Sequence, residues 1–162
     1  MEFSGYMKIE GDIQGVIEGS SIRKNRETSI DLFSFKHEIK LPTNVQSGMG
    51  NGPVIHQPIV LLKEVDKSTP KLYRALVEKE RLNTVEFEWF RYTAQGEELV
   101  YYRIELINAH IISISPWTPA LEKAESEYLR FMENVTLAYE GITWSWGPDG
   151  DVTYQTNWRG EQ

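Results

Sequence analysis

Residues 64–80, with the sequence EVDKSTPKLYRALVEKE, decide the fold because they contain the clearest helix signal in a chain dominated by strand-like patterns. Thr69 is placed to cap the helix with its hydroxyl group, and Pro70 suits the first helical position, where a missing N–H has no cost. Apolar side chains recur at helical spacing in one stripe that consists of Leu72, Tyr73, Ala75, Leu76 and Val77. We expect Leu72, Ala75 and Leu76 to be core contacts, and only β-structure is available to cover them.

The rest of the chain is predicted to be strands at 6–10, 15–19, 29–41, 54–62, 84–92, 99–113, 134–146 and 152–158. The apolar side chains of the 29–41 stretch change phase, which indicates either a bulge near residues 32 and 33 or a strand buried on both sides. Closing a sheet of about eight strands into a barrel removes its exposed edges. The sequence therefore predicts a mainly β fold: a closed β-barrel with one flanking α-helix at about 70–80.

A long extended loop is predicted at about 42–53, where glycine, asparagine and serine interrupt the strand pattern. Gly48, Gly50 and Gly52 have the spacing of a phosphate-binding loop, but the lysine and the following helix are missing. Composition therefore favours a flexible loop. In the 116–132 segment, propensity favours a short helix through Leu121, Ala124, Tyr128 and Met132.

Length and composition indicate one soluble domain spanning 1–162. The chain has no cysteine, so disulfides and thiolate metal sites are excluded. A net charge of −7 argues against nucleic-acid binding and against anionic membrane surfaces. The first residues have neither the basic nor the apolar region of a Sec signal peptide, and no apolar run suggests stable membrane insertion.

No catalytic, metal or cofactor site is predicted. His37, His56 and His110 are far apart in sequence and lack a second ligand at helical or strand spacing, although a site assembled across strands stays possible. Glu86 and Glu88 share one strand face, whereas glycosidase carboxylates approach a sugar from opposite sides.

Large aromatic side chains are the remaining candidate binding feature: Trp89, Trp117, Trp144, Trp146, Tyr154 and Trp158. Exposed on a β-sandwich, they could stack on sugar rings. We favour the alternative that they fill a barrel core or a subunit interface.

Six motifs that follow one another along nearly the whole chain are similar to those of one family. They occupy residues 30–39, 41–43, 54–58, 66–72, 85–90 and 133–146. In this order they resemble the Hcp family, the haemolysin-coregulated proteins that form the inner tube of type VI secretion systems.

The resemblance implies a non-enzymatic homohexameric ring that stacks into a tube, leaves the cytoplasm by the type VI route without a Sec signal, and needs no cofactor. It also implies contacts with sheath, baseplate or spike, and effector proteins carried in the lumen. In the family, the long loop that corresponds to this one reaches toward neighbouring subunits. The resemblance therefore implies these candidates for contacts between subunits: Thr43, Asn44, Val45, Gln46, Ser47, Gly48, Met49, Gly50, Asn51 and Gly52.

The family also implies irregular loop rather than helix at 117–127, and no effector extension after residue 162. A phage-type tail tube protein and a carbohydrate-binding β-sandwich module are the alternatives.

Overall fold

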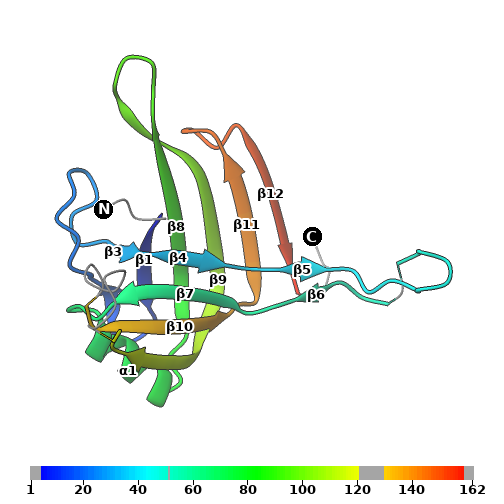
Figure 1. Cartoon of the computed structure of the whole chain (residues 1–162), viewed down its shortest axis with the longest axis horizontal. Coiled ribbons are helices and arrows are strands. Elements are labelled where there is room, and N and C mark those ends of the chain that lie inside the picture. Colours follow the sequence, from blue (N-terminus) through cyan, green and yellow to red (C-terminus); the bar gives the residue numbers. More distant parts are fainter. Residues whose placement is uncertain (1–4, 51, 121–129, 159–162) are drawn as a thin grey trace.

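The structure is a computed structural model, and it describes residues 5–50, 52–120 and 130–158. In these ranges the chain is mainly β with one helix (Figure 1). No helix in the described ranges has the length and hydrophobicity needed to cross a bilayer. In chain order the elements are β1 (Gly5–Gly11), β2 (Gly15–Ile17), β3 (Ile30–Leu32), β4 (Ser34–Lys36), β5 (Ile39–Lys40), β6 (Ile55–His56), β7 (Ile59–Glu64), α1 (Thr69–Val77), β8 (Leu82–Tyr92), β9 (Glu98–Trp117), β10 (Met132–Ala138), β11 (Gly141–Trp146) and β12 (Val152–Asn157).

The barrel is closed by the short stretch that contains β3 and β4. Antiparallel pairing runs in the order β1–β8–β9–β10–β7–β4, and β3 pairs with β1 at the other end of this series. Phe33 separates β3 from β4, and its backbone N–H donates to the Leu62 carbonyl at 2.8 Å. One continuous stretch therefore joins the two ends of the series. This confirms the closed barrel, and the expected irregularity near residues 32 and 33 is the break at Phe33.

The long strand β9 holds the two parts of the sheet together. Its residues pair with β8, with β11 through Tyr102–Ile107, and with β10 through His110–Trp117. The predicted single strand at 134–146 is wrong, because Tyr139 and Glu140 separate β10 from β11. Asn108 takes a positive φ of 52° opposite this break, and its side-chain amide donates to Glu140 at 3.0 Å. The bend in β9 thus requires a bend in its partner.

The helix packs its apolar side against the barrel. Leu72 and Ala75 are fully buried in the core, and Leu76 is partly buried against it, whereas Val77 is 75% exposed. The expected cap at Thr69 is wrong: Ser68 occupies the N-cap position and makes no side-chain cap hydrogen bond.

The Thr69 hydroxyl instead joins a buried polar network between the helix start and the barrel. It accepts from the Asp66 N–H at 3.0 Å and donates to Glu133 at 2.9 Å. Lys63 on β7 and Glu133 on β10 are fully buried, directly opposite in register, and form an ion pair. The Lys63 ammonium also donates to the Glu64 carbonyl at 3.0 Å and to the Asp66 carboxylate at 3.2 Å. The segment before α1 is therefore fixed to two neighbouring strands.

The segment at 116–132, where propensity and family resemblance disagree, is only partly described. β9 ends at Trp117, whose indole N–H donates to Asn134 at 2.8 Å, and β10 begins at Met132. Leu121, Ala124 and Tyr128 lie outside the described residues.

We predict that Leu72→Ala destabilises the fold by about 2–5 kcal/mol, because it removes a fully buried side chain and leaves a cavity. Leu76→Ala is expected to cost less, since that side chain is partly exposed. Val77→Ala on the wet side of the helix is the control, with a change within about 0.5 kcal/mol. Urea denaturation measures the free energy of unfolding of all three variants. Equal losses of stability in the Leu72 and Val77 variants would show that the apolar side of the helix does not pack against the barrel.

We predict a non-additive result when the buried ion pair is removed. Lys63→Met alone should cost about 3–5 kcal/mol, because it leaves the buried Glu133 carboxylate without its cation. Glu133→Leu alone should cost less, because Lys63 keeps its ion pair with Asp66. The double variant should be more stable than either single variant, since no buried charge remains. A double-mutant cycle by chemical denaturation measures this coupling, and additive losses would contradict it.

Candidate assembly site

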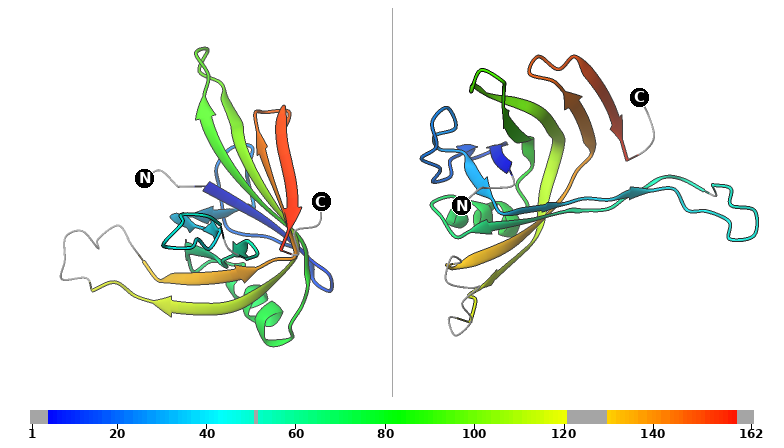
Figure 2. Two further views of the ribbon diagram at one scale, coloured as in Figure 1. Left: turned by 90° about the vertical axis from the view of Figure 1, so that its right-hand side faces the viewer. Right: turned by 45° about the horizontal axis from the view of Figure 1, so that its top comes forward.

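A β-hairpin arm, residues 39–56, projects from the barrel (Figures 1 and 2). Its base is the pairing of β5 with β6, Ile39 with His56 and Lys40 with Ile55. Further out, Thr43 bridges to Gly50, and the Asn44 N–H donates to the Met49 carbonyl at 2.7 Å. The predicted flexible loop at 42–53 is therefore an extended hairpin with its own backbone hydrogen bonds.

Two glycines allow the tip of the arm to turn and pack closely. Gly48 has φ of +71°, a conformation that L side chains rarely adopt, and its N–H donates to the Asn44 carbonyl at 2.7 Å. A Cβ atom on Gly50 would overlap the Leu41 side chain. The turn therefore favours glycine at position 48, whereas a side chain at position 50 would require the half-exposed Leu41 side chain to move.

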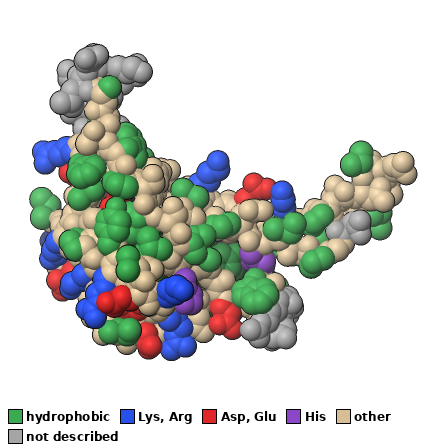
Figure 3. All heavy atoms as spheres, turned by 90° about the horizontal axis from the view of Figure 1, so that it is seen from below, with side chains coloured by type: hydrophobic (Ala, Val, Ile, Leu, Met, Phe, Trp, Pro, Cys, Tyr) green, Lys and Arg blue, Asp and Glu red, His purple; other side chains and the backbone are tan. Residues whose placement is uncertain are grey.

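The arm exposes apolar side chains that its own barrel does not cover. Figure 3 shows hydrophobic side chains spread along it. They are Leu41, Val45, Met49, Val54 and Ile55, with Val45 97% and Met49 68% exposed. Such a set on a projecting element is typical of a protein interaction surface.

The predicted assembly candidates all belong to this arm. The structure places Thr43 to Gly50 and Gly52 on its exposed outer part. Asn51 lies outside the described residues. The helix positions are not part of the arm: Leu72 and Ala75 belong to the hydrophobic core, and Leu76 packs against it.

At the root of the arm, His37 and His56 converge on Tyr139 from the turn between β10 and β11. The Tyr139 hydroxyl lies 3.1 Å from His37 Nε2 and 2.6 Å from His56 Nδ1. Both imidazole rings stand edge to face with the phenol ring, with centroids 5.6 Å apart. We call these three side chains the root cluster.

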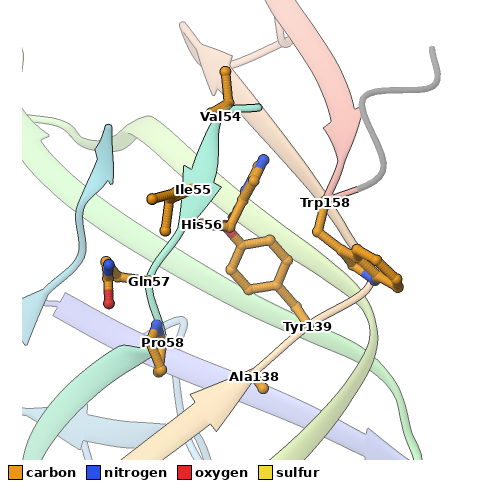
Figure 4. A pocket seen from close by; sticks show the side chains of 8 residues that line it. All are labelled: Val54, Ile55, His56, Gln57, Pro58, Ala138, Tyr139 and Trp158. Atoms are coloured by element: carbon orange, nitrogen blue, oxygen red, sulfur yellow. Dashed lines mark hydrogen bonds between the residues drawn. The ribbon is translucent and has the colours of Figure 1, made fainter. Parts of the chain in front are cut away.

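A hollow of about 420 Å³ adjoins the root cluster (Figure 4). Residues 54–58 of the arm line one side, and Ala138, Tyr139 and Trp158 line the other. Burial raises the pKa of Tyr139 far above its usual value, so the phenol stays protonated. Burial also lowers the pKa of His56. The pKa of His37 is lowered mainly by burial and, to a smaller extent, by the charge of His56.

Sequence spacing did not reveal the root cluster. His37 and His56 are brought together by the register of β5 and β6, which local periodicity does not specify. His110 is separate and exposed on β9. Among the described residues, no group of three or more histidine or acidic side chains is placed to hold a metal ion.

Glu86 and Glu88 are paired with cations rather than arranged around a substrate. Glu88 is buried and lies 3.1 Å from Lys8 and 3.6 Å from Arg103. Glu86 lies 3.4 Å from Arg103. The two carboxylates therefore belong to an ion-paired strand face across β1, β8 and β9.

The aromatic residues divide between core and surface. Trp89 and Trp144 pack against the core. Tyr154 stacks on Trp144 with centroids 6.2 Å apart, and it is 52% exposed, as is Trp158. Trp146 on β11 is also exposed. Trp144, Trp146 and Tyr154 share one face of the β11–β12 hairpin, whereas Trp117 lies at the other end of β9, so the six aromatic residues do not gather in one place.

The barrel, its helix and the exposed arm define a β-barrel protein with a projecting arm that carries exposed apolar side chains. The chain belongs to the Hcp family of type VI secretion: the family model "Type VI secretion system effector, Hcp" matches residues 6–146.

Individual relatives agree along the full length. The Pseudomonas aeruginosa protein named Major exported protein is 31% identical, over 98% of this chain and 97% of that protein. A crystal structure of an Hcp protein is 28% identical with a TM-score of 0.89, over 99% of this chain and 100% of that one. Hcp1 of the E. coli EAEC 042 pathovar is 29% identical with a TM-score of 0.84, over 97% of this chain and 99% of that one.

Proposed function

We propose that this chain is a structural, non-enzymatic subunit of the type VI secretion tube, in which copies close into hexameric rings and the rings stack. The observation that carries the proposal is the projecting arm, on which Val45 is 97% and Met49 68% exposed in the isolated chain. Leaving apolar surface in water is unfavourable, and a neighbouring subunit can cover it.

The arm also suits the symmetry of a ring. A ring needs a heterologous interface, in which one surface of a subunit contacts a different surface of the next. An arm that leaves its own barrel can reach such a different surface. Membership of the Hcp family supports this assignment over a phage-type tail tube, and it gives no support to a carbohydrate-binding module.

The same proposal includes export and partners. The chain would remain cytoplasmic until the system fires and then leave by the type VI route, as the name of the Pseudomonas aeruginosa relative suggests for that protein. Its partners would be its own copies, the sheath, the baseplate or spike, and effectors held in the lumen. Residues 1–162 would act as a single tube domain without a cofactor.

We predict that Val45→Asp weakens assembly at least tenfold while leaving the fold intact. It places a charge on the arm where the proposal requires a dry contact, and the side chain is 97% exposed in the isolated chain. Val77→Asp is the matched control, since Val77 is 75% exposed on the helix. Analytical ultracentrifugation measures the assembled fraction, and circular dichroism checks the fold. Assembly that is equal for both variants would contradict the proposed role of the arm.

A further inference from the structure

The direction of the arm depends on few contacts with the barrel. Pairing of β4 with β7 ends at Lys36 and Val60, and the next pairs join β5 only to β6. Residues 37–38 and 57–58 are therefore two single-chain connections. The Gln57 N–H donates to the Glu38 carbonyl at 3.0 Å, and the His37 side chain is hydrogen-bonded to the Gln57 backbone. The root cluster lies at this point, and Tyr139 is its contact on the barrel side.

Hydrogen bonding within the root cluster is complete when both imidazoles are neutral. The Tyr139 hydroxyl then donates to one ring nitrogen and accepts from the other. A first proton keeps these bonds but places a charge in a half-buried hollow. A second proton makes both facing nitrogens donors, so the phenol proton loses its acceptor and two positive rings lie against one oxygen.

Among the described residues, no carboxylate favours the charged form of either imidazole. For His37 the hydrogen bond with the Gln57 backbone opposes the lowering of its pKa, but burial and the charge of His56 outweigh it. Lys36, Glu38 and Lys40 flank His37 along the chain, and Glu140 follows Tyr139. The Glu140 carboxylate accepts from the Asn108 amide. Neither imidazole has a carboxylate partner within the described part of the chain.

The sign of the pH dependence follows from the depressed pKa values of both histidines. Because the folded root binds protons less readily than an open one, it is stable above the ordinary histidine pKa of about 6.5. This stability is lost as the pH falls through the lower pKa values of the folded state.

We propose that His37, Tyr139 and His56 form a pH-sensitive latch, which fixes the root of the arm while both rings are neutral and releases it when they are protonated. The latch is a property of the single chain. Its consequence for assembly rests on the proposed function: mild acid would free the arm and weaken contacts between subunits.

Hydrogen–deuterium exchange tests the latch directly. Protection of the Gln57 amide and of the β5 and β6 amides is measured at pH 7.5 and pH 5.0, with rates corrected for the intrinsic pH dependence of exchange. In the unaltered chain we expect about a tenfold or greater loss of protection at pH 5.0, confined to the arm and its root. Protection that stays constant between the two pH values would overturn the proposal.

The three histidines supply matched variants. The double variant His37→Gln/His56→Gln keeps polar side chains that cannot titrate, so the arm should exchange equally at both pH values. His110→Gln removes the exposed histidine on β9 and should behave like the unaltered chain. A pH response that persists in the double variant would contradict the latch.

A second measurement uses the unaltered chain, so its result does not depend on whether the variants fold. NMR titration of the unaltered chain gives the midpoints of the three imidazoles. The opening of the arm should follow the midpoints of His37 and His56 and not that of His110. Opening that follows His110 alone would overturn the proposal.

Mass photometry at both pH values distinguishes a failure of the latch from a failure of the proposed ring assembly. A chain that stays monomeric throughout, yet opens its arm in acid, supports the latch and contradicts the ring. Rings with an arm that exchanges equally at both pH values support the ring and contradict the latch.

Discussion

The fold depends on the buried ion pair between Lys63 and Glu133. Both side chains are fully buried, and removing two charges from water is costly unless each is paired and hydrogen-bonded. Their partners are supplied by the segment just before and at the start of α1, through Asp66 and Thr69. These contacts attach the start of the helix to β7 and β10, and the apolar side of the helix packs against the barrel. Residues 64–80, which give the clearest helix signal in the sequence, thus also supply the hydrogen-bond partners of the buried ion pair.

The same strands connect this core to the arm. β7 carries Lys63 and pairs with β4, and both strands continue beyond the barrel into residues 37–58. A rigid pair of strands at the base gives the arm a defined origin, and the root cluster then sets its direction. An arm held in this way is suited to contact between subunits, because less order has to be gained when a neighbour binds. Membership of the Hcp family gives this arrangement its context in type VI secretion.

Local patterns in the sequence predict the helix and most strands of the fold. They do not predict features that depend on contacts between residues distant in sequence. The spacing of Leu72 and Ala75 predicts the helix, and the alternation at 84–113 predicts the hairpin of β8 and β9. The break at Tyr139 depends on the positive φ of Asn108 on another strand, which periodicity at 134–146 does not record. Glycine-rich composition indicates a loop at 42–53 but not that it forms a hairpin. Thr69 has the residue type of a cap, yet Glu133, distant in sequence, takes its hydroxyl.

Native mass spectrometry of the purified protein shows whether this chain assembles into a closed ring. One chain has a mass of 18.8 kDa. For a hexameric ring assembled through the arm, we expect a dominant species with six times this mass, seen as ring-shaped particles by negative-stain microscopy. A single-chain mass that persists at high protein concentration and neutral pH would contradict it.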